Sequence, residues 1–199
     1  MNLKLLAVII AICAASKLAA EPRFEVDFWT GYSFPVNQVI RDQCNIPATG
    51  NYCRIGGMSF GTGLYIASIG QLRTGLGLAF VPISDGTLKV SDTVLVNIGA
   101  SYAPVLFQVR YDLGPVHFQL GTGYSLTVER PRVYSGQPAS TADGGAYTAS
   151  SEIGFRAAIS ENAAFYAAFK YLVFVPISSG EALHVVLPTF GVQASLAGS

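Results

Sequence analysis

The most regular feature of the chain is an alternation of apolar and polar side chains along residues 101–130. The odd-numbered positions from Ala103 to Tyr111 and most even-numbered positions from Val116 to Leu126 are apolar or aromatic, whereas Gln, Arg, His, Ser and Gly occupy most positions between them. A period of two predicts β-strands, and Asp112–Pro115 between the two arms predicts a tight turn. Each arm has about 9–11 residues, the length of a tilted strand that crosses a bilayer.

Six further segments alternate in the same way, so we expect eight strands. The strands are expected at about 23–33, 57–69, 72–82, 103–111, 116–127, 146–160, 163–174 and 184–196. The connections 70–71, 112–115 and 161–162 are short, whereas 35–55, 83–99, 130–145 and 176–183 are longer. Short turns at one end and long loops at the other are typical of an up-and-down barrel in an outer membrane.

The charged residues of the expected strands all fall on the polar face. They are Arg23, Glu25, Asp27, Arg73, Arg110, Glu152, Arg156 and Lys170. A soluble barrel places apolar residues inside and charges outside, so a soluble fold would bury these groups and expose a wide apolar wall. The pattern therefore predicts an all-β fold, an eight-stranded antiparallel up-and-down transmembrane β-barrel with short periplasmic turns and longer extracellular loops.

Aromatic residues on the apolar faces are expected to gather at the two ends of the barrel. Those at the loop ends are Tyr32, Phe60, Phe80, Tyr124, Tyr147 and Tyr171, and those at the turn ends are Phe24, Tyr111, Phe118 and Phe165. Two such girdles, one at each interface, are typical of barrels in membranes.

The N-terminus has the pattern of a secretory signal peptide. Lys4 precedes a short apolar run, and Leu18–Ala20 offers small residues at a cleavage site, with a cut after Ser16 as the alternative. The run is too short for a transmembrane helix. We expect residues 1–20 to be removed and residues 21–199 to form a single barrel domain.

Composition and charge narrow the possible partners. Lys plus Arg and Asp plus Glu are 12 each, so the formal net charge is zero and no nucleic-acid partner is expected.

The chain resembles the small eight-stranded outer-membrane barrel proteins of Gram-negative bacteria, the OmpA-barrel, OmpX and Opa-like group, over residues 23–196. The resemblance rests on the strand pattern and the loop asymmetry. It implies an outer-membrane location, contact with outer-membrane lipid and lipopolysaccharide, and a host or surface partner reached through the extracellular loops. One departure is the C-terminus, because these proteins often end their last strand with an aromatic residue, whereas the nearest aromatic here is Phe190.

The inward-facing charges are expected to pair with one another, because an unpaired buried charge costs several kcal/mol. This lumen charge network would consist of Glu25, Asp27, Arg73, Arg110, Glu152, Arg156 and Lys170. An eight-stranded barrel has room for little more than its side chains, so we expect a plug that sets the strand register. The alternative is a narrow ion path gated by these pairs.

Three strands carry pairs of inward-facing glycines, at 61 and 63, 75 and 77, and 121 and 123. We expect them to relieve curvature and to admit large neighbours such as Trp29 or Tyr65. The alternative is a small cavity for water or a ligand.

Cys44 and Cys53 lie nine positions apart in the first long loop. In a secreted chain such a pair is expected to form a disulfide, which would stiffen the loop. No metal site is expected, because two thiols without a nearby His are too few ligands.

Catalytic motifs are scarce. His117 is expected inside the barrel, whereas His184 lies near the outer rim with Glu181 and Ser178–Ser179 close in sequence. These groups could form a base and nucleophile, as in barrels that modify lipid A, but no family motif surrounds them and polar loop residues are the simpler interpretation. We therefore expect no enzyme activity and no cofactor.

The expected function is structural or adhesin-like, with surface loops displayed for a partner. The run Thr93–Val96 suggests that the strands beside it project beyond the bilayer and offer an edge to a partner strand. The alternatives are a narrow porin-like channel, a lipid A-modifying enzyme and a soluble secreted ligand-binding barrel.

Overall fold

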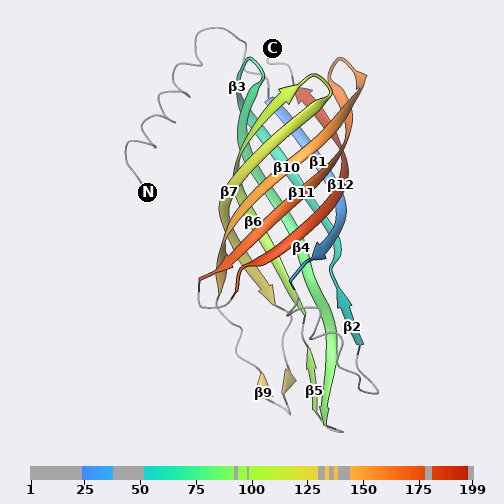
Figure 1. Ribbon diagram of the computed structural model, residues 1–199, viewed down its shortest axis with the longest axis vertical. Helices are drawn as coiled ribbons and strands as arrows, with labels where there is room; N and C mark the ends of the chain where they lie inside the picture. Colours follow the sequence, from blue (N-terminus) through green and yellow to red (C-terminus); the bar gives the residue numbers. More distant parts are fainter. Residues whose placement is uncertain are drawn as a thin grey trace.

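The computed structural model describes residues 24–37, 52–91, 94–97, 99–129, 133–134, 137–138, 144–177 and 181–196. Every regular element in these ranges is a β-strand (Figure 1). The strands are β1 (Phe24–Pro35), β2 (Tyr52–Ile55), β3 (Gly57–Ile69), β4 (Leu72–Ser91), β5 (Val94–Asn97), β6 (Ala100–Leu113), β7 (Val116–Glu129), β8 (Val133–Tyr134), β9 (Gln137–Pro138), β10 (Gly145–Ser160), β11 (Ala163–Pro176) and β12 (Leu183–Leu196).

Among the described strands, eight form a closed antiparallel barrel. They follow the order β1, β3, β4, β6, β7, β10, β11 and β12, and each pairs with the next. The barrel closes because β12 pairs back onto β1, from Phe24 opposite Leu196 to Pro35 opposite Val185. The predicted eight-stranded antiparallel barrel is confirmed.

Short turns and long connections lie at opposite ends of the barrel, as predicted (Figure 1). Gly70 and Gly114 adopt φ angles of 59° and 61° in two of the short turns, a left-handed conformation that favours glycine. The predicted turn Asp112–Pro115 needs correction, because β6 continues to Leu113 and only Gly114 and Pro115 form the turn. Asp112 therefore belongs to the strand, where it pairs with His117 of β7.

The two faces of the wall differ as the alternation predicted. Large apolar side chains cover the outer wall, and Leu120, Phe169 and Tyr147 remain 65–66% exposed. The inner face carries the charged and polar side chains, of which Glu25 and Arg110 are each 3% exposed. The barrel is therefore apolar outside and ionic inside over much of its length.

The segment 83–99 was predicted as a loop carrying a short strand, and this assignment needs correction. β4 continues to Ser91 and is 20 residues long, so it projects beyond the barrel (Figure 1). β2 pairs with one stretch of this extension, with Ile55 opposite Ser84, and β5 pairs with another, with Leu88 opposite Val96. These pairings provide hydrogen-bond partners for the backbone N–H and C=O groups of the part of β4 that extends beyond the barrel wall. The chain can therefore continue as a strand past residue 83.

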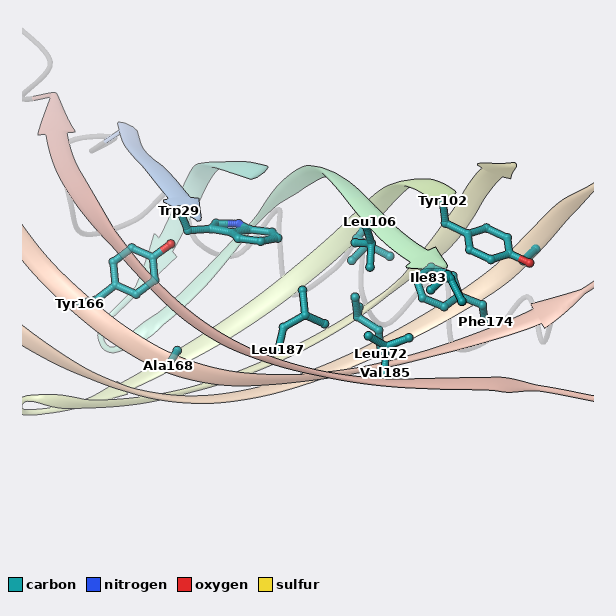
Figure 2. Close-up of a cluster of buried hydrophobic side chains, with 12 residues drawn as sticks. Trp29, Ile83, Tyr102, Leu106, Tyr166, Ala168, Leu172, Phe174, Val185 and Leu187 are labelled. Carbon is teal, nitrogen blue, oxygen red and sulfur yellow. The ribbon is translucent and has the colours of Figure 1, made fainter. Parts of the chain in front are cut away.

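A hydrophobic core lies inside the loop-end half of the barrel, and the alternation alone did not indicate it. We call it the apolar cap and define it by Val81, Ile83, Tyr102, Leu106, Leu172, Phe174, Val185 and Leu187. Figure 2 shows its side chains converging from several strands, with Trp29 and Tyr166 toward the other end. β4 and β6 lie three or four places around the eight-stranded ring from β11 and β12, so these residues meet across the lumen.

Two of the six inward-facing glycines, Gly61 and Gly77, make room for large side chains, as predicted. Trp29 is paired with Gly61, and a Cβ atom at residue 61 would lie 2.4 Å from its ring. A Cβ atom at Gly77 would lie 2.5–2.7 Å from three atoms of the Gln108 side chain. A glycine therefore stands where a bulky neighbour crosses the narrow lumen.

We predict that Gly77→Ala destabilises the barrel by about 1 kcal/mol, the lower end of the usual cost of overpacking, because the group it would meet is the amide end of Gln108. Because the atoms in the way belong to one flexible side chain, the same change should cost much less in a Gln108→Ala background. Urea unfolding followed through Trp29, the single tryptophan, measures both. An equal cost in the two backgrounds would contradict this steric explanation.

Candidate functional site: an ion-pair network in the barrel interior

The turn-end half of the interior holds a group of three guanidinium and two carboxylate groups, which we call the arginine cluster. Glu25 of β1 contacts Arg73 of β4, whose Nε lies 3.0 Å from Glu25 Oε1, and Arg110 of β6 donates to Glu25 Oε2. Asp112 of β6 lies 3.0 Å from Arg73 Nε, 3.2 Å from Arg110 Nε and 3.5 Å from Arg156 Nη1 of β10. Side chains from four strands are thus joined across the lumen.

Polar side chains complete the surroundings of this cluster. Gln193 Nε2 donates to Glu25 Oε2 at 2.5 Å, which ties β12 to β1. The Arg110 guanidinium carbon lies 4.2 Å from the centroid of the Tyr65 ring, and Tyr65 Oη donates to Gln119 Oε1 at 2.5 Å. A cation over an aromatic face is attracted by the ring quadrupole, so Tyr65 helps to hold Arg110 in place.

A second group, the lysine cluster, lies nearer the middle of the barrel. Lys170 of β11 forms an ion pair with Glu152, its direct partner on β10. The other carboxylate oxygen of Glu152 lies 2.7 Å from His117 Nε2. Lys170 Nζ lies 4.5 Å from the centroid of the Trp29 ring, so the ammonium group has both an ionic and an aromatic partner.

The interior charges of the described residues balance. The acidic groups are Glu25, Asp27, Asp112 and Glu152, and the basic groups are Arg73, Arg110, Arg156 and Lys170. Asp27 is buried, and its Oδ1 atom has no hydrogen-bond partner among the described residues. Pairing matters because removal of one partner leaves an uncompensated buried charge.

The structure places the seven residues of the expected network inside the barrel but divides most of them between the two clusters. Sequence reasoning left out Asp112, which it assigned to the turn, and did not pair His117 with Glu152. Both could have been found, because Asp112 continues the inward positions of Gln108 and Arg110, and His117 faces Asp112 across the hairpin. Arg23 lies outside the described residues.

The expected disulfide cannot be placed, because Cys44 and the side chain of Cys53 lie outside the described residues.

His184 contacts Tyr171 and Asn37 among the described residues. Its Nδ1 lies 2.6 Å from Tyr171 Oη, and the two rings stack with centroids 5.8 Å apart. Its backbone N–H donates to Asn37 Oδ1 at 2.7 Å. Glu181 is exposed, and Ser178 and Ser179 lie outside the described residues. Within the described ranges, no three His, Cys, Asp or Glu residues group as metal ligands.

A small cavity separates the lysine cluster from the apolar cap. Its volume is about 20 Å³, and its lining includes Gln108, Glu152 and Lys170 on the polar side and Leu106 and Leu172 on the apolar side. This space suits about one water molecule. Among the described residues, the space at this level is therefore too small for a ligand larger than water.

We predict that Lys170→Met destabilises the barrel by about 3–5 kcal/mol, because Glu152 would remain buried without its main counter-charge. Adding Glu152→Gln should recover more than half of that loss. Urea unfolding of the refolded protein measures single and double variants. If the double variant is as unstable as Lys170→Met, the coupling between the two groups is absent.

No model of a protein family matches the chain, and no curated protein matches it by sequence. The structure is similar to Neisserial surface protein A, with a TM-score of 0.54 and 14% identity over 86% of this chain and 96% of that one. It is also similar to Ail, the attachment invasion locus protein of Yersinia pestis, with a TM-score of 0.51 and 11% identity over 89% of this chain and all of that one.

A third similar structure is the outer membrane protein AlkL in lipid bilayers, with a TM-score of 0.50 and 10% identity over 92% of this chain and 95% of that one. Such low identities establish the fold alone. The chain thus has the fold of the small eight-stranded outer-membrane β-barrels.

Proposed function

We propose that the protein resides in the outer membrane as a closed barrel whose role is structural or adhesin-like, without catalysis. The observation that carries this proposal is the outer wall. Leu120, Tyr147, Phe169 and Phe190 on β7, β10, β11 and β12 are each 63–66% exposed. On the other four strands of the ring, Phe28, Phe60, Leu78 and Val105 are 46–59% exposed. An apolar belt of this extent exceeds the patches that soluble monomers carry, whereas acyl chains would cover it at no cost in solvation.

Aromatic pairs across neighbouring strands support a membrane position. Tyr124 lies opposite Tyr147, and Phe60 lies opposite Phe80, with ring centroids 6.4 and 5.4 Å apart. At the turn end, Tyr111 lies opposite Phe118. Paired rings at both ends of an apolar belt suit the two interfaces of a bilayer. The wall between them would contact acyl chains. The outer leaflet of that membrane would consist of lipopolysaccharide.

The surface role is supported by the projecting end of the barrel. The extension of β4, with β2 and β5 beside it, would stand outside the membrane if the short turns face the periplasm. Two proteins of the same fold carry the names surface protein and attachment invasion locus protein. We infer that this chain also presents its loop end to a partner on another surface.

The absence of catalysis is supported by the surroundings of His184, which contacts Tyr171 and Asn37 rather than a carboxylate among the described residues. Mass spectrometry of lipid A from cells with and without the protein tests this point. An altered acyl pattern that depends on the protein would overturn it.

The membrane position is tested by fractionation and surface proteolysis. The protein should sediment with the outer membrane, require detergent for release and migrate differently on gels before and after boiling. Trypsin added to intact cells should cut only at the loop end. Recovery in the soluble fraction without detergent would favour a soluble ligand carrier instead.

We predict that Leu120→Arg lowers stability in lipid vesicles by about 2–4 kcal/mol, because Leu120 lies on the outer wall between the aromatic girdles. Ile159→Arg is the matched control, because Ile159 is also exposed but lies close to the short turn after Ser160. An arginine at that position should lower stability by only about 0–1 kcal/mol. Urea titration in vesicles compares them. Equal small costs would argue against lipid around the wall.

A further inference from the structure

The two halves of the barrel interior differ in chemistry. The turn-end half contains the arginine and lysine clusters, whereas the loop-end half contains the apolar cap. Figure 2 shows the cap as a series of side chains along the lumen, from Leu106 and Leu187 to Tyr102 and Phe174. An ion that crossed the barrel would therefore meet a polar region and an apolar region in turn.

The cap closes the lumen by contacts between opposite strands. Tyr102 of β6 and Phe174 of β11 stack with ring centroids 4.5 Å apart and an angle of 16° between their planes. Val81, Val185 and Leu187 are completely buried. These side chains are therefore shielded from solvent and form one packed cluster across the lumen of the described barrel.

The strands that flank these bulky residues carry small side chains at the same end. Ser33 Oγ donates to the Gly57 carbonyl oxygen at 3.1 Å, and Ser125 Oγ lies 2.5 Å from Thr148 Oγ1. These hydroxyl groups are buried and bond to the protein. The hydrogen-bonding capacity of these hydroxyl groups is therefore used within the protein.

The turn-end half, by contrast, opens to solvent. A polar depression of about 480 Å³ at this mouth is lined in part by Glu25, Arg73, Arg156 and Gln193. The side chains of Arg73 and Arg156 are 17% and 21% exposed. Above this mouth the charged groups are buried, with Glu25 and Arg110 each 3% exposed, and the small cavity beside Lys170 lies between them and the cap.

We propose that the apolar cap is the barrier that seals this barrel against water and ions, and that the turn-end half is a polar interior open to solvent only at its mouth. The inference rests on the proposed membrane position. A narrow apolar constriction excludes water, and an ion cannot enter without its hydration shell, so such a constriction blocks conduction. The ion pairs hold the strands together, but they are not the seal.

Conductance of the refolded protein in planar lipid bilayers tests this proposal. The cap variant Leu106→Ser/Phe174→Ser/Leu187→Ser replaces one cap side chain on each of three strands, β6, β11 and β12. The control variant Glu25→Gln/Glu152→Gln removes one charge from each ionic cluster with little change in size. We expect the unchanged protein and the control to carry no steady current, and the cap variant to carry a persistent ohmic current at least tenfold larger.

Two results would overturn the proposal: steady current through the control variant but not through the cap variant, or a cap variant that folds, inserts and remains closed. If the triple variant does not fold, Leu187→Asn replaces it, because this change nearly preserves the side-chain volume. The measurement is then the osmotic water permeability of vesicles that contain the protein. An increase supports a hydrophobic seal, and no change overturns it. Failure of the membrane position itself is distinguishable, because the unchanged protein would then neither insert nor show a heat-dependent gel shift.

Discussion

Backbone hydrogen bonding between the first and last strands is the constraint on which the whole structure depends. β1 pairs with β12 along almost its full length, so the wall has no open edge. An open sheet of this composition would leave unpaired N–H and C=O groups beside an apolar surface, where nothing could satisfy them. Closure therefore permits an outer wall of phenylalanine, leucine and tyrosine, and that wall underlies the proposed residence in a membrane.

Closure also creates a narrow interior that must be filled. In the turn-end half, arginine, lysine and carboxylate groups fill it and neutralise one another. In the loop-end half, apolar side chains from opposite strands fill it and exclude water. Glycine allows this crowding where Trp29 crosses Gly61 and where Gln108 crosses Gly77. The same lack of space that requires the ion pairs explains why the cavity between them and the cap suits only about one water molecule.

The ends of the barrel differ in the same systematic way. At one end the strands turn within two residues, and the mouth of the lumen is polar and open to solvent. At the other end β4 continues past the wall and gains β2 and β5 as partners, directly beyond the apolar cap. A sealed, well-packed base is a suitable support for segments that project from the membrane. This asymmetry links the packing of the interior to the proposed surface role.

Much of this architecture is determined by the sequence alone, because a period of two assigns each side chain to one face once a strand is recognised. The eight strands, the short turns and the inward direction of Glu25, Arg110 and Glu152 all follow from that period. The shortest segments between strands also indicated which connections were tight, because so few residues can form only a turn.

The tertiary structure decided what the alternation cannot express, namely which inward side chains meet across the lumen. Leu106 and Leu187 occupy polar-face positions of separate strands, and only closure of the ring brings them together as part of the cap. Asp112 joins Arg73 and Arg156 for the same reason, after the strand proved two residues longer than the turn signal suggested. Periodicity along a strand gives direction, whereas partners across a barrel depend on strand order and register, which involve residues far apart in the chain.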